Sequence, residues 1–292
     1  MTGSVRRPHQ ALLRPRVESA AVVKHILRAV RSGDLSIAKA ARLLEQGYLP
    51  GGKHAKFDLP RASRTGLPEI LLGEGKSLEH FEELLVELRR SGAGVIISRL
   101  TRPQLRSLQR HRLEGWDLEI HTGPRLALLN RDSIERSLAG RRAALISAGT
   151  ADAHVAEEVR LVLEALGSEV ITSHDVGVAG IHRLLRELPR LAAARPSVYI
   201  VCAGREGALA TVVAGLVDRP VIGVPTSQGY GRGGAGEGAL TSMLQSCAPL
   251  AVVNIDGGVP AALVATQILQ LAGRASGAPH RRKRPPRSAK SR

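Results

Sequence analysis

Cysteine and aromatic residues are scarce in this chain of 292 residues. Two cysteines are too few for a disulfide scaffold and are typical of a reducing compartment. Aromatic residues make up only 2% of the sequence, so few rings are available for stacking on nucleic-acid bases. No apolar run reaches the roughly 18 residues of a membrane-spanning helix, and no apolar segment follows the basic start as in a secretory signal. We therefore expect a cytoplasmic protein that does not enter a membrane.

Acidic residues are outnumbered, but the excess of positive charge lies mainly at the two ends of the chain. The formal net charge is +16. Residues 280–292 carry seven lysines and arginines and no acid, and residues 6–16 carry four arginines, which leaves +5 for the remainder. Such charge is typical of solvated, disordered tails. We interpret residues 1–16 and 275–292 as such tails, with nonspecific RNA binding as the weaker alternative.

The body of the chain has apolar periodicity of two kinds, which divides it into two domains. Residues 17–138 begin with two helical patterns that end at Gln46, followed by an irregular polar stretch over residues 56–77. Beyond that stretch we expect helices at 78–92 and 102–111 and short strands at 94–99, 117–122 and 125–131. This pattern predicts a smaller N-terminal domain that is partly helical and partly α/β.

Residues 139–274 alternate strand and helix patterns. The expected strands are the apolar segments 143–150, 169–176, 198–204, 221–227 and 250–256, and a helical pattern follows each of them. Parallel strands need such crossover connections, which are right-handed. The predicted fold class is therefore α/β, with a doubly wound, five-stranded parallel sheet layered as in flavodoxin.

Each of the five expected strands ends in polar or glycine-rich residues. The segments are SAGTAD (147–152), HDVGVAG (174–180), AGREG (203–207), PTSQGYG (225–231) and NIDGG (254–258). In a doubly wound sheet the carboxyl ends of the strands meet at one rim, where ligands bind. Gly149 and Thr150 can offer N–H groups and a hydroxyl to a phosphate where a helix begins. One such turn has a plain structural explanation, but five together favour a nucleotide-like ligand.

The longest glycine-rich segment precedes one of the two cysteines. Residues 229–238 contain six glycines, and the helical pattern that follows ends near Cys247. Glycine loses more backbone entropy on ordering than any other residue, so such a run calls for a functional reason. We expect this loop to be mobile and to close over a phosphate-bearing ligand beside the sulfur, with Arg232 swinging in. An ordinary solvated loop is the alternative.

Several of these motifs resemble the LarB family, the pyridinium-3,5-biscarboxylic acid mononucleotide synthases. The segments that carry the resemblance are SAGTADAHVAEE, DVGVAGIHRLL, AGREGALATVVAGLVDRPVIGVPTSQGYG, SMLQSCA and VVNIDGG, with FDLPRASRTGLPEILLGEGKS in the N-terminal half. The C-terminal half is also similar to the PurE-like aminoimidazole ribonucleotide carboxylases, with SAGTAD in place of their phosphate-binding motif. The resemblance spans about residues 31–273, with departures at 58–61 and 257–260.

The resemblance implies a two-part reaction on nicotinic acid adenine dinucleotide. The family carboxylates the pyridinium ring with CO2 or bicarbonate as co-substrate and hydrolyses the phosphoanhydride to release AMP, in the synthesis of the nickel-pincer nucleotide cofactor. A pyridinium ring is too electron-poor to attack CO2, whereas its thiolate adduct is an enamine that can do so. The expected partners are this dinucleotide and further copies of the chain, an octamer by resemblance, but neither a membrane nor nucleic acid. Mg²⁺ is the expected cofactor, with ligands unknown.

Three side chains are assigned to catalysis, and each has a plainer alternative. Cys247 takes the position of the family's covalent cysteine, but from the residues alone a small buried residue at a helix end is an equal interpretation. Glu206 could take the ring proton or orient the ribose, or simply favour a helix start. Asp152 could cap a helix, or hold a ribose hydroxyl or Mg²⁺. Cys202 lies within an apolar strand and is expected in the core.

Thirteen further residues are assigned to substrate binding from the strand-end motifs and the resemblance. They are Ser147, Gly149, Thr150, Asp175, His182, Gly204, Gly207, Thr226, Ser227, Gly229, Tyr230, Gly231 and Asp256. His182 belongs to the HRLL segment of the family, although a lone histidine is more often structural.

Two other functions stay open at this point. One is an aminoimidazole ribonucleotide carboxylase or mutase of purine synthesis, whose chemistry needs no thiol. The other is a non-catalytic nucleotide-binding or RNA-binding protein, which only the charge favours. The apolar helix expected at residues 261–273 needs a covering partner, and we expect it to be buried between subunits.

Overall fold

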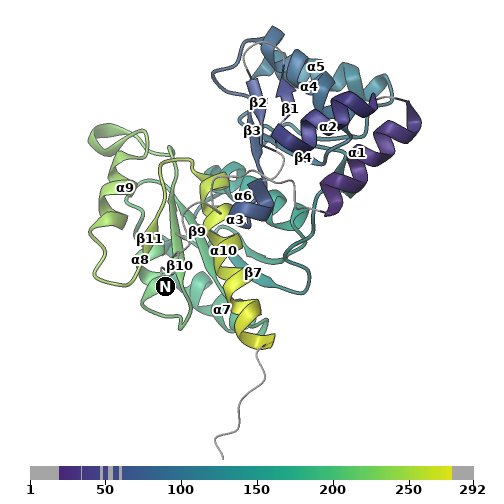
Figure 1. Cartoon of the computed structure of the whole chain (residues 1–292). Helices are drawn as coiled ribbons and strands as arrows, with labels where there is room; N and C mark the ends of the chain where they lie inside the picture. Colours follow the sequence, from purple (N-terminus) through teal and green to yellow (C-terminus); the bar gives the residue numbers. More distant parts are fainter. Residues whose placement is uncertain (1–19, 34, 47–48, 52–54, 59–60, 278–292) are drawn as a thin grey trace, which may run out of the picture.

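The computed structural model describes residues 20–33, 35–46, 49–51, 55–58 and 61–277. Figure 1 shows two lobes, one built on a sheet of N-terminal strands and one on a sheet of C-terminal strands. Helix α10 (Gly258–Gly277) includes the first residues of the predicted tail at 275–292, and the rest of that tail and residues 1–16 lie outside the described residues. None of the described helices is long and apolar enough to cross a membrane.

The N-terminal lobe contains a four-stranded mixed sheet. Its order is β3 (Ile70–Leu72), β4 (Val95–Ser98), β6 (Leu126–Leu129) and β5 (Leu118–His121). β3 runs parallel to β4, whereas β6 is antiparallel to both β4 and β5. Three of these strands were predicted. β3 was not, because its three residues lie within a stretch that is otherwise polar and rich in glycine and proline.

Capping residues mark the ends of two helices in the N-terminal lobe. The helices of this lobe are α1 (Ala20–Ser32), α2 (Ile37–Gln46), α4 (Leu78–Ser91) and α5 (Arg102–Leu113), beside a two-stranded antiparallel pair of β1 (Leu49–Gly51) and β2 (Ala55–Phe57). The short helix α3 (Arg61–Thr65) lies instead next to α10 (Figure 1), where the Gln270 side chain donates to the Gly66 carbonyl at 2.7 Å. The Ser77 hydroxyl accepts from the His80 N–H at the start of α4, and Gly92 ends it with φ of 59°. Thr101 and Gln104 form a capping box on α5.

The C-terminal lobe is built on a five-stranded, all-parallel sheet. Its strands are β7 (Arg142–Ser147), β8 (Glu169–Ser173), β9 (Tyr199–Ala203), β10 (Val221–Pro225) and β11 (Ala251–Val252). The order β8-β7-β9-β10-β11 reverses direction between β7 and β9, which is the flavodoxin-like arrangement. The predicted fold class is confirmed, and each predicted strand is present, although β11 is only two residues long.

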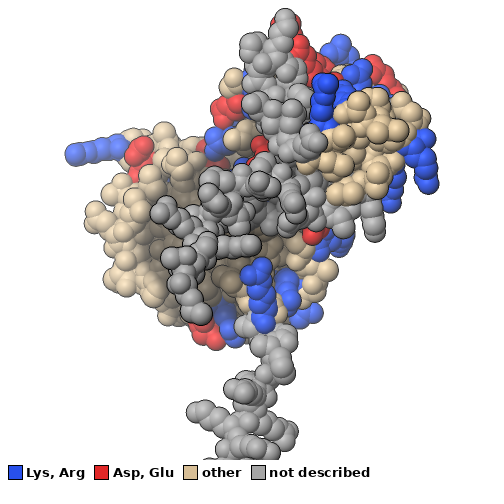
Figure 2. Space-filling model, viewed as in Figure 1, with Lys and Arg blue, Asp and Glu red and all other residues tan. Residues whose placement is uncertain are grey.

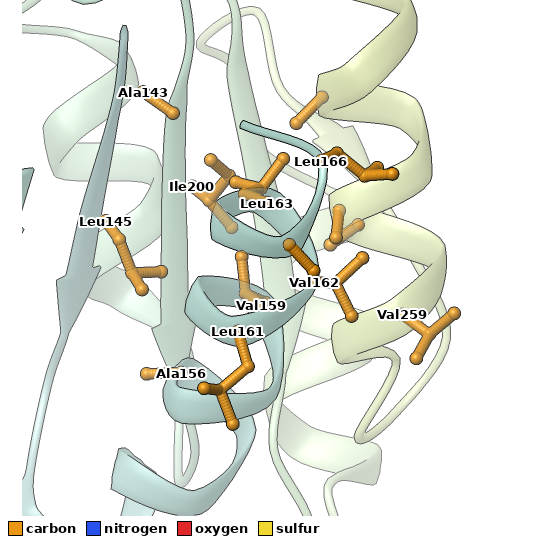
Figure 3. Packing of buried hydrophobic residues seen from close by; sticks show 14 of the residues in the cluster. Ala143, Leu145, Ala156, Val159, Leu161, Val162, Leu163, Leu166, Ile200 and Val259 are labelled. Atoms are coloured by element: carbon orange, nitrogen blue, oxygen red, sulfur yellow. The ribbon is translucent and has the colours of Figure 1, made fainter. Parts of the chain in front are cut away.

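Helices cover both faces of the parallel sheet. The remaining helices are α6 (Ala153–Ala165), α7 (Ile181–Ala193), α8 (Ala208–Ala214) and α9 (Glu237–Leu244). Alternate residues of β9 face different layers: Ile200 and Cys202 pack with α6 and α10, whereas Tyr199 packs with the cluster of α7, α8 and α9. Figure 3 shows the first layer, with Val159 and Leu163 of α6 close to Ile200. Burial raises the pKa of the Cys202 thiol, which lies in the core as predicted.

The two lobes share one hydrophobic core. Ile96 of β4 and Leu126 and Leu128 of β6 belong to the same buried cluster as α6 and α10. Their neighbours on the opposite face, such as Ile97 and Leu129, pack instead with the helices of the N-terminal lobe. The mixed sheet therefore lies between its own helices and the C-terminal lobe.

Polar contacts accompany this shared core. The Glu158 carboxylate on α6 accepts hydrogen bonds from the Ser98 hydroxyl and, at 3.2 Å, from the Val259 N–H at the start of α10. Burial raises the pKa of Glu158, and the bond from Ser98 opposes that rise. Nearby, Arg99 donates to the backbone oxygen of Asp256 at 3.2 Å. A buried carboxylate thus ties both lobes to the first turn of α10.

Helix α10 is covered mainly by α6 of its own chain. Ala262, Ala265 and Leu269 are fully buried against that helix. Val264 and Leu271 are its exposed large apolar side chains, at 37% and 63%. The argument that the helix needs a second subunit therefore applies only to these two residues.

Candidate active site

A cavity of about 460 Å³ opens at the rim where the strands of the parallel sheet end. It adjoins the switch point between β7 and β9, where the fold predicts a ligand. Four of the five strand-end motifs contribute to its wall. The lining residues include Ala148, Gly149, Asp152, Gly177, Arg183, Gly204, Arg205, Glu206, Gln228, Gly229 and Tyr230.

Asp152 holds two loops of this cavity together. One carboxylate oxygen accepts from the Gly149 N–H at 2.8 Å, and the other accepts from the Thr226 hydroxyl. The residue is only 4% exposed, so both oxygens are used inside the protein. Asp152 therefore joins the turn after β7 to the end of β10. Asp152 thus has the helix-capping role that was the alternative to ligand binding, and it also binds a second loop.

The AGREG turn and the glycine-rich segment are in direct backbone contact. The Arg205 N–H donates to the Gln228 carbonyl at 2.7 Å. A Cβ on Gly204 would lie 2.3 Å from that same carbonyl oxygen, so only glycine fits there. Gly207, with φ of 63°, then begins α8. Glu206, between these two glycines, is exposed and lines the cavity.

Tyr230 anchors the start of the glycine-rich loop. The Arg205 guanidinium lies 4.7 Å from the centre of its ring and donates to its hydroxyl at 3.2 Å. The tyrosine is 78% exposed and lines the cavity, so this pair forms part of the outer wall. Arg232 is exposed and does not line the cavity. Closure of the loop over a ligand stays a prediction.

Arg183 is a lining residue that the sequence did not single out. Its guanidinium bonds to the Asp175 carboxylate at 2.5 Å. A Cβ on Gly180 would lie 2.7 Å from the Arg183 Nε, so this glycine leaves room for the side chain. The neighbouring His182, which was singled out, is exposed and lines neither described cavity. Adjacent residues of a helix point in different directions, so the choice of His182 should have prompted a test of Arg183 as well.

Several assigned residues lie behind the cavity wall or beside it. Those that do not line the cavity are Ser147, Thr150, Asp175, His182, Gly207, Thr226, Ser227, Gly231 and Asp256. The Ser147 hydroxyl is hydrogen-bonded to His174 Nδ1 at 2.9 Å, and the Ser227 N–H donates to Asp256 at 2.8 Å. These two hydrogen bonds join strand-end segments to one another, whereas Asp175 lines a second cavity.

Cys247 lies at the opposite rim of the sheet. It is exposed and follows α9, which leads away from the glycine-rich loop over about 12 Å. β11 begins four residues later and pairs Ala251 with Ile222, near the start of β10. The thiol is thus at the rim where strands begin, whereas the cavity is at the rim where they end. The expectation that one chain places the sulfur beside the loop is not met.

The described side chains offer no ready metal cage. No group of three or more His, Cys, Asp or Glu side chains that could hold an ion occurs among the residues the structure describes. Both oxygens of Asp152, the residue considered for Mg²⁺, already accept hydrogen bonds. The expected Mg²⁺ stays a prediction.

Comparison with known proteins gives a consistent result for both lobes. The model of the LarB/PurE-like N-terminal domain matches residues 51–130, and the AIR carboxylase model matches residues 142–282. The chain is also 34% identical over 253 residues to the uncharacterized protein MJ0165 of Methanocaldococcus jannaschii, covering 85% of this chain and 97% of that protein. The chain belongs to the LarB family. Its two matched regions are those of a carboxylase-type enzyme.

This LarB protein has a second relative. It is 35% identical over 132 residues to the N5-carboxyaminoimidazole ribonucleotide mutase of the same organism, across 44% of this chain and 78% of that enzyme. The similarity to this purine enzyme therefore covers less than half of the chain. The match to the LarB/PurE-like N-terminal domain model is a separate similarity of this chain.

Proposed function

We propose that this LarB protein carboxylates the pyridinium ring of nicotinic acid adenine dinucleotide with CO2 or bicarbonate, and hydrolyses the phosphoanhydride to release AMP. The observation that carries the proposal is the cavity at the switch point, in a chain that also has the LarB N-terminal domain. Arg183 and Arg205 bring positive charge to this cavity for the phosphates. Glu206 is an exposed carboxylate in the wall, suited to accept the ring proton.

The proposed carboxylation proceeds through a thiolate adduct. The Cys247 sulfur forms a bond to the ring carbon para to the nitrogen, and the ring nitrogen takes up the displaced electron pair. The resulting enamine attacks CO2 through the ring carbon that is meta to the nitrogen and does not yet carry a carboxyl group. This attack forms the new C–C bond. Loss of the proton from that carbon restores the enamine, whose nitrogen pair then expels the thiolate and regenerates the pyridinium ring.

Because Cys247 and the cavity of one chain lie at opposite rims, the thiolate is proposed to come from a second copy of the chain. The surface around Cys247 suits such a contact. Residues 238–255 contain no charged side chain, and Leu244 at the end of α9 is 66% exposed. Figure 2 shows the corresponding face, over α9, as largely free of Lys, Arg, Asp and Glu. Depletion of charge around an exposed large apolar side chain is typical of a subunit interface.

Mixed oligomers test this arrangement. Cys247→Ser and Glu206→Gln are each expected to abolish carboxylation, measured by mass spectrometry after incubation with the dinucleotide and bicarbonate. Co-expression of the two variants should restore part of the activity, because some sites then combine an intact thiol with an intact cavity. Cys202→Ser, in the core, is the control and should retain the chemistry. Full activity of Cys247→Ser would overturn the thiolate mechanism, and no restoration in the mixture would overturn the shared site.

The mutase relative supplies the second candidate, carboxylation or rearrangement of an aminoimidazole ribonucleotide. The same assay with aminoimidazole ribonucleotide in place of the dinucleotide separates the two. Turnover of the imidazole compound, with none of the dinucleotide, would replace the proposed function by this one.

A further inference from the structure

A second cavity of about 450 Å³ lies beside the first, along the edge strand β8. Its wall consists of the end of β8, the loop at residues 174–176 and one face of α7. Arg183 lines both cavities, so the two spaces adjoin through this side chain. A volume of this size falls within the range of small-molecule sites.

Arginines dominate the helical wall of the second cavity. Arg183, Arg186 and Arg190 are spaced three and four residues apart, which places them on one face of α7. Two of them have carboxylate partners: Arg183 bonds to Asp175, and Arg190 bonds to Glu187. Within the described part of the chain, Arg186 makes no hydrogen bond or ion pair. One lining guanidinium therefore keeps its donors available for an anion.

The opposite wall adds polar groups of a second kind. His174 lines the cavity and engages one ring nitrogen with Ser147, which leaves the other nitrogen for a ligand. Thr172 and Ser173 lie at the end of β8, where Arg190 also donates to the Thr172 carbonyl at 2.7 Å. With three arginines against two carboxylates, the lining has a net positive charge.

We propose that this second cavity binds the adenylate half of the dinucleotide, an inference that rests on the proposed function. The pyridinium half then occupies the first cavity, and the pyrophosphate lies at Arg183 between the two. Arg186 takes the adenylate phosphoryl group, because a guanidinium presents paired donors that match phosphate oxygens. The planar guanidinium groups of α7 also offer surfaces on which an adenine ring can stack.

This placement gives the hydrolysis a physical basis. Water forms a new bond to one phosphorus as the bridging oxygen leaves with the other phosphorus and the bonding electron pair, and a proton is released to solvent. Negative charge develops on that bridging oxygen, next to Arg183. A positively charged donor fixed by Asp175 stabilises such charge. AMP is then held by α7 as a separate product, apart from the carboxylated mononucleotide.

Equilibrium binding of AMP to the full-length protein tests the inference without any turnover. Isothermal titration should give an AMP affinity at least tenfold weaker for Arg186→Ala than for the unsubstituted protein, with Arg186→Lys between them. Arg219→Ala is the matched control, since this exposed arginine lies just before β10 and lines neither cavity. It should bind AMP as the unsubstituted protein does. Inorganic phosphate, tested alone, should bind much more weakly than AMP.

The outcomes separate this inference from the proposed function. AMP binding that Arg186→Ala leaves unchanged, or equal affinity for phosphate and AMP, would overturn the adenylate site even if the dinucleotide is carboxylated. AMP binding that depends on Arg186, in a protein that does not turn over the dinucleotide, would support the site and overturn the proposed function. With both correct, Arg186→Ala should raise the KM for the dinucleotide about tenfold and leave the binding of nicotinic acid mononucleotide unchanged.

Discussion

The two sheets of this protein are covered in different ways. The parallel sheet has helices of its own lobe on both faces, α6 and α10 on one side and α7, α8 and α9 on the other. The mixed sheet has its own helices on one face only, and its second face packs into the core of the C-terminal lobe. The parallel sheet resembles a self-contained domain, whereas the mixed sheet depends on its neighbour.

This difference indicates what the N-terminal lobe contributes. Its sheet supports α6 and the start of α10, and Arg99 reaches the backbone of Asp256. Asp256 in turn accepts from the Ser227 N–H, in the segment that leads to the cavity wall. The described residues of the N-terminal lobe therefore stabilise the outer layer of the C-terminal lobe and line neither of the two cavities.

The largest expected effect on stability comes from creating a cavity in the core that the two lobes share. Leu128→Ala removes a side chain that packs against the C-terminal lobe, and should lower the free energy of unfolding by about 2–5 kcal/mol. We expect it to lower hydrogen-exchange protection in β7 and β9 as well as in its own strand. Unfolding in denaturant, followed by the fluorescence of Trp116 in the N-terminal lobe and by circular dichroism, measures the loss.

Leu129→Ala is the matched control, because this adjacent residue of β6 packs with the N-terminal helices alone. It should be about as destabilising by Trp116 fluorescence, with a smaller loss of protection in β7 and β9. Equal loss of protection there for the two variants would remove the distinction between the faces.

A smaller effect is expected from the buried carboxylate between the lobes. The raised pKa of Glu158 means that its contribution to stability is fully present below the unfolded pKa, near 4.5, and is lost as pH rises through the folded value. Glu158→Gln cannot ionise, so its stability relative to the unsubstituted protein should increase with pH over that window. The gain is roughly 1.4 kcal/mol for each unit of pKa elevation. Denaturant titrations between pH 4 and 8, on the order of half a unit apart, measure it.

Glu157→Gln, on the same helix, is expected to change with pH in the opposite direction. Its hydrogen bond from Arg160 lowers the pKa of Glu157, so the contribution of that carboxylate is present above its unfolded pKa and is lost as pH falls. The variant should therefore be less stable than the unsubstituted protein at neutral pH and match it in acid. Parallel pH profiles for the two variants would contradict at least one of the two assignments.

The smallest expected effect concerns the exposed link between the lobes. Arg99→Ala removes the bond to the Asp256 carbonyl and the ion pair with Glu74, and should cost at most about 1 kcal/mol, because the pair is largely solvated. Thermal denaturation measures the loss. Arg142→Ala, which breaks an exposed pair with Glu169 inside one lobe, is the control. If the N-terminal lobe supports the cavity wall, the KM should rise for Arg99→Ala and not for Arg142→Ala. The reverse result would count against that supporting role.

The sequence predicted the parallel sheet well, because buried parallel strands are short apolar runs separated by long helical patterns. It predicted the mixed sheet less completely. β3 contributes only Ile70–Leu72, too short for a periodic pattern, and its pairing with β4 depends on contacts between segments far apart in the chain. The local sequence pattern could not predict that Leu126 and Leu128 pack against the other lobe. An apolar residue in a strand indicates burial, but it does not indicate which lobe covers it.

The sequence predicted which backbone segments form the candidate site, but it predicted fewer of the side chains that line it. The glycines at strand ends were found because strand-to-helix turns and close backbone contacts demand them, as at Gly204. Arg183 was overlooked because arginines on an amphipathic helix are usually solvated. Cys247 was placed beside the loop because the two are close in sequence, whereas α9 carries the chain to the other rim.

The two cysteine thiols of this protein differ in a way that is useful in the laboratory. Cys202 is fully buried, and burial raises the pKa of its thiol, while Cys247 is exposed. Alkylating reagents react with accessible thiolates, so a maleimide dye should modify the folded chain once and the unfolded chain twice. The protein thus carries a built-in, single attachment point for a fluorophore, and the ratio of labels per chain reports directly on how much of a sample is folded.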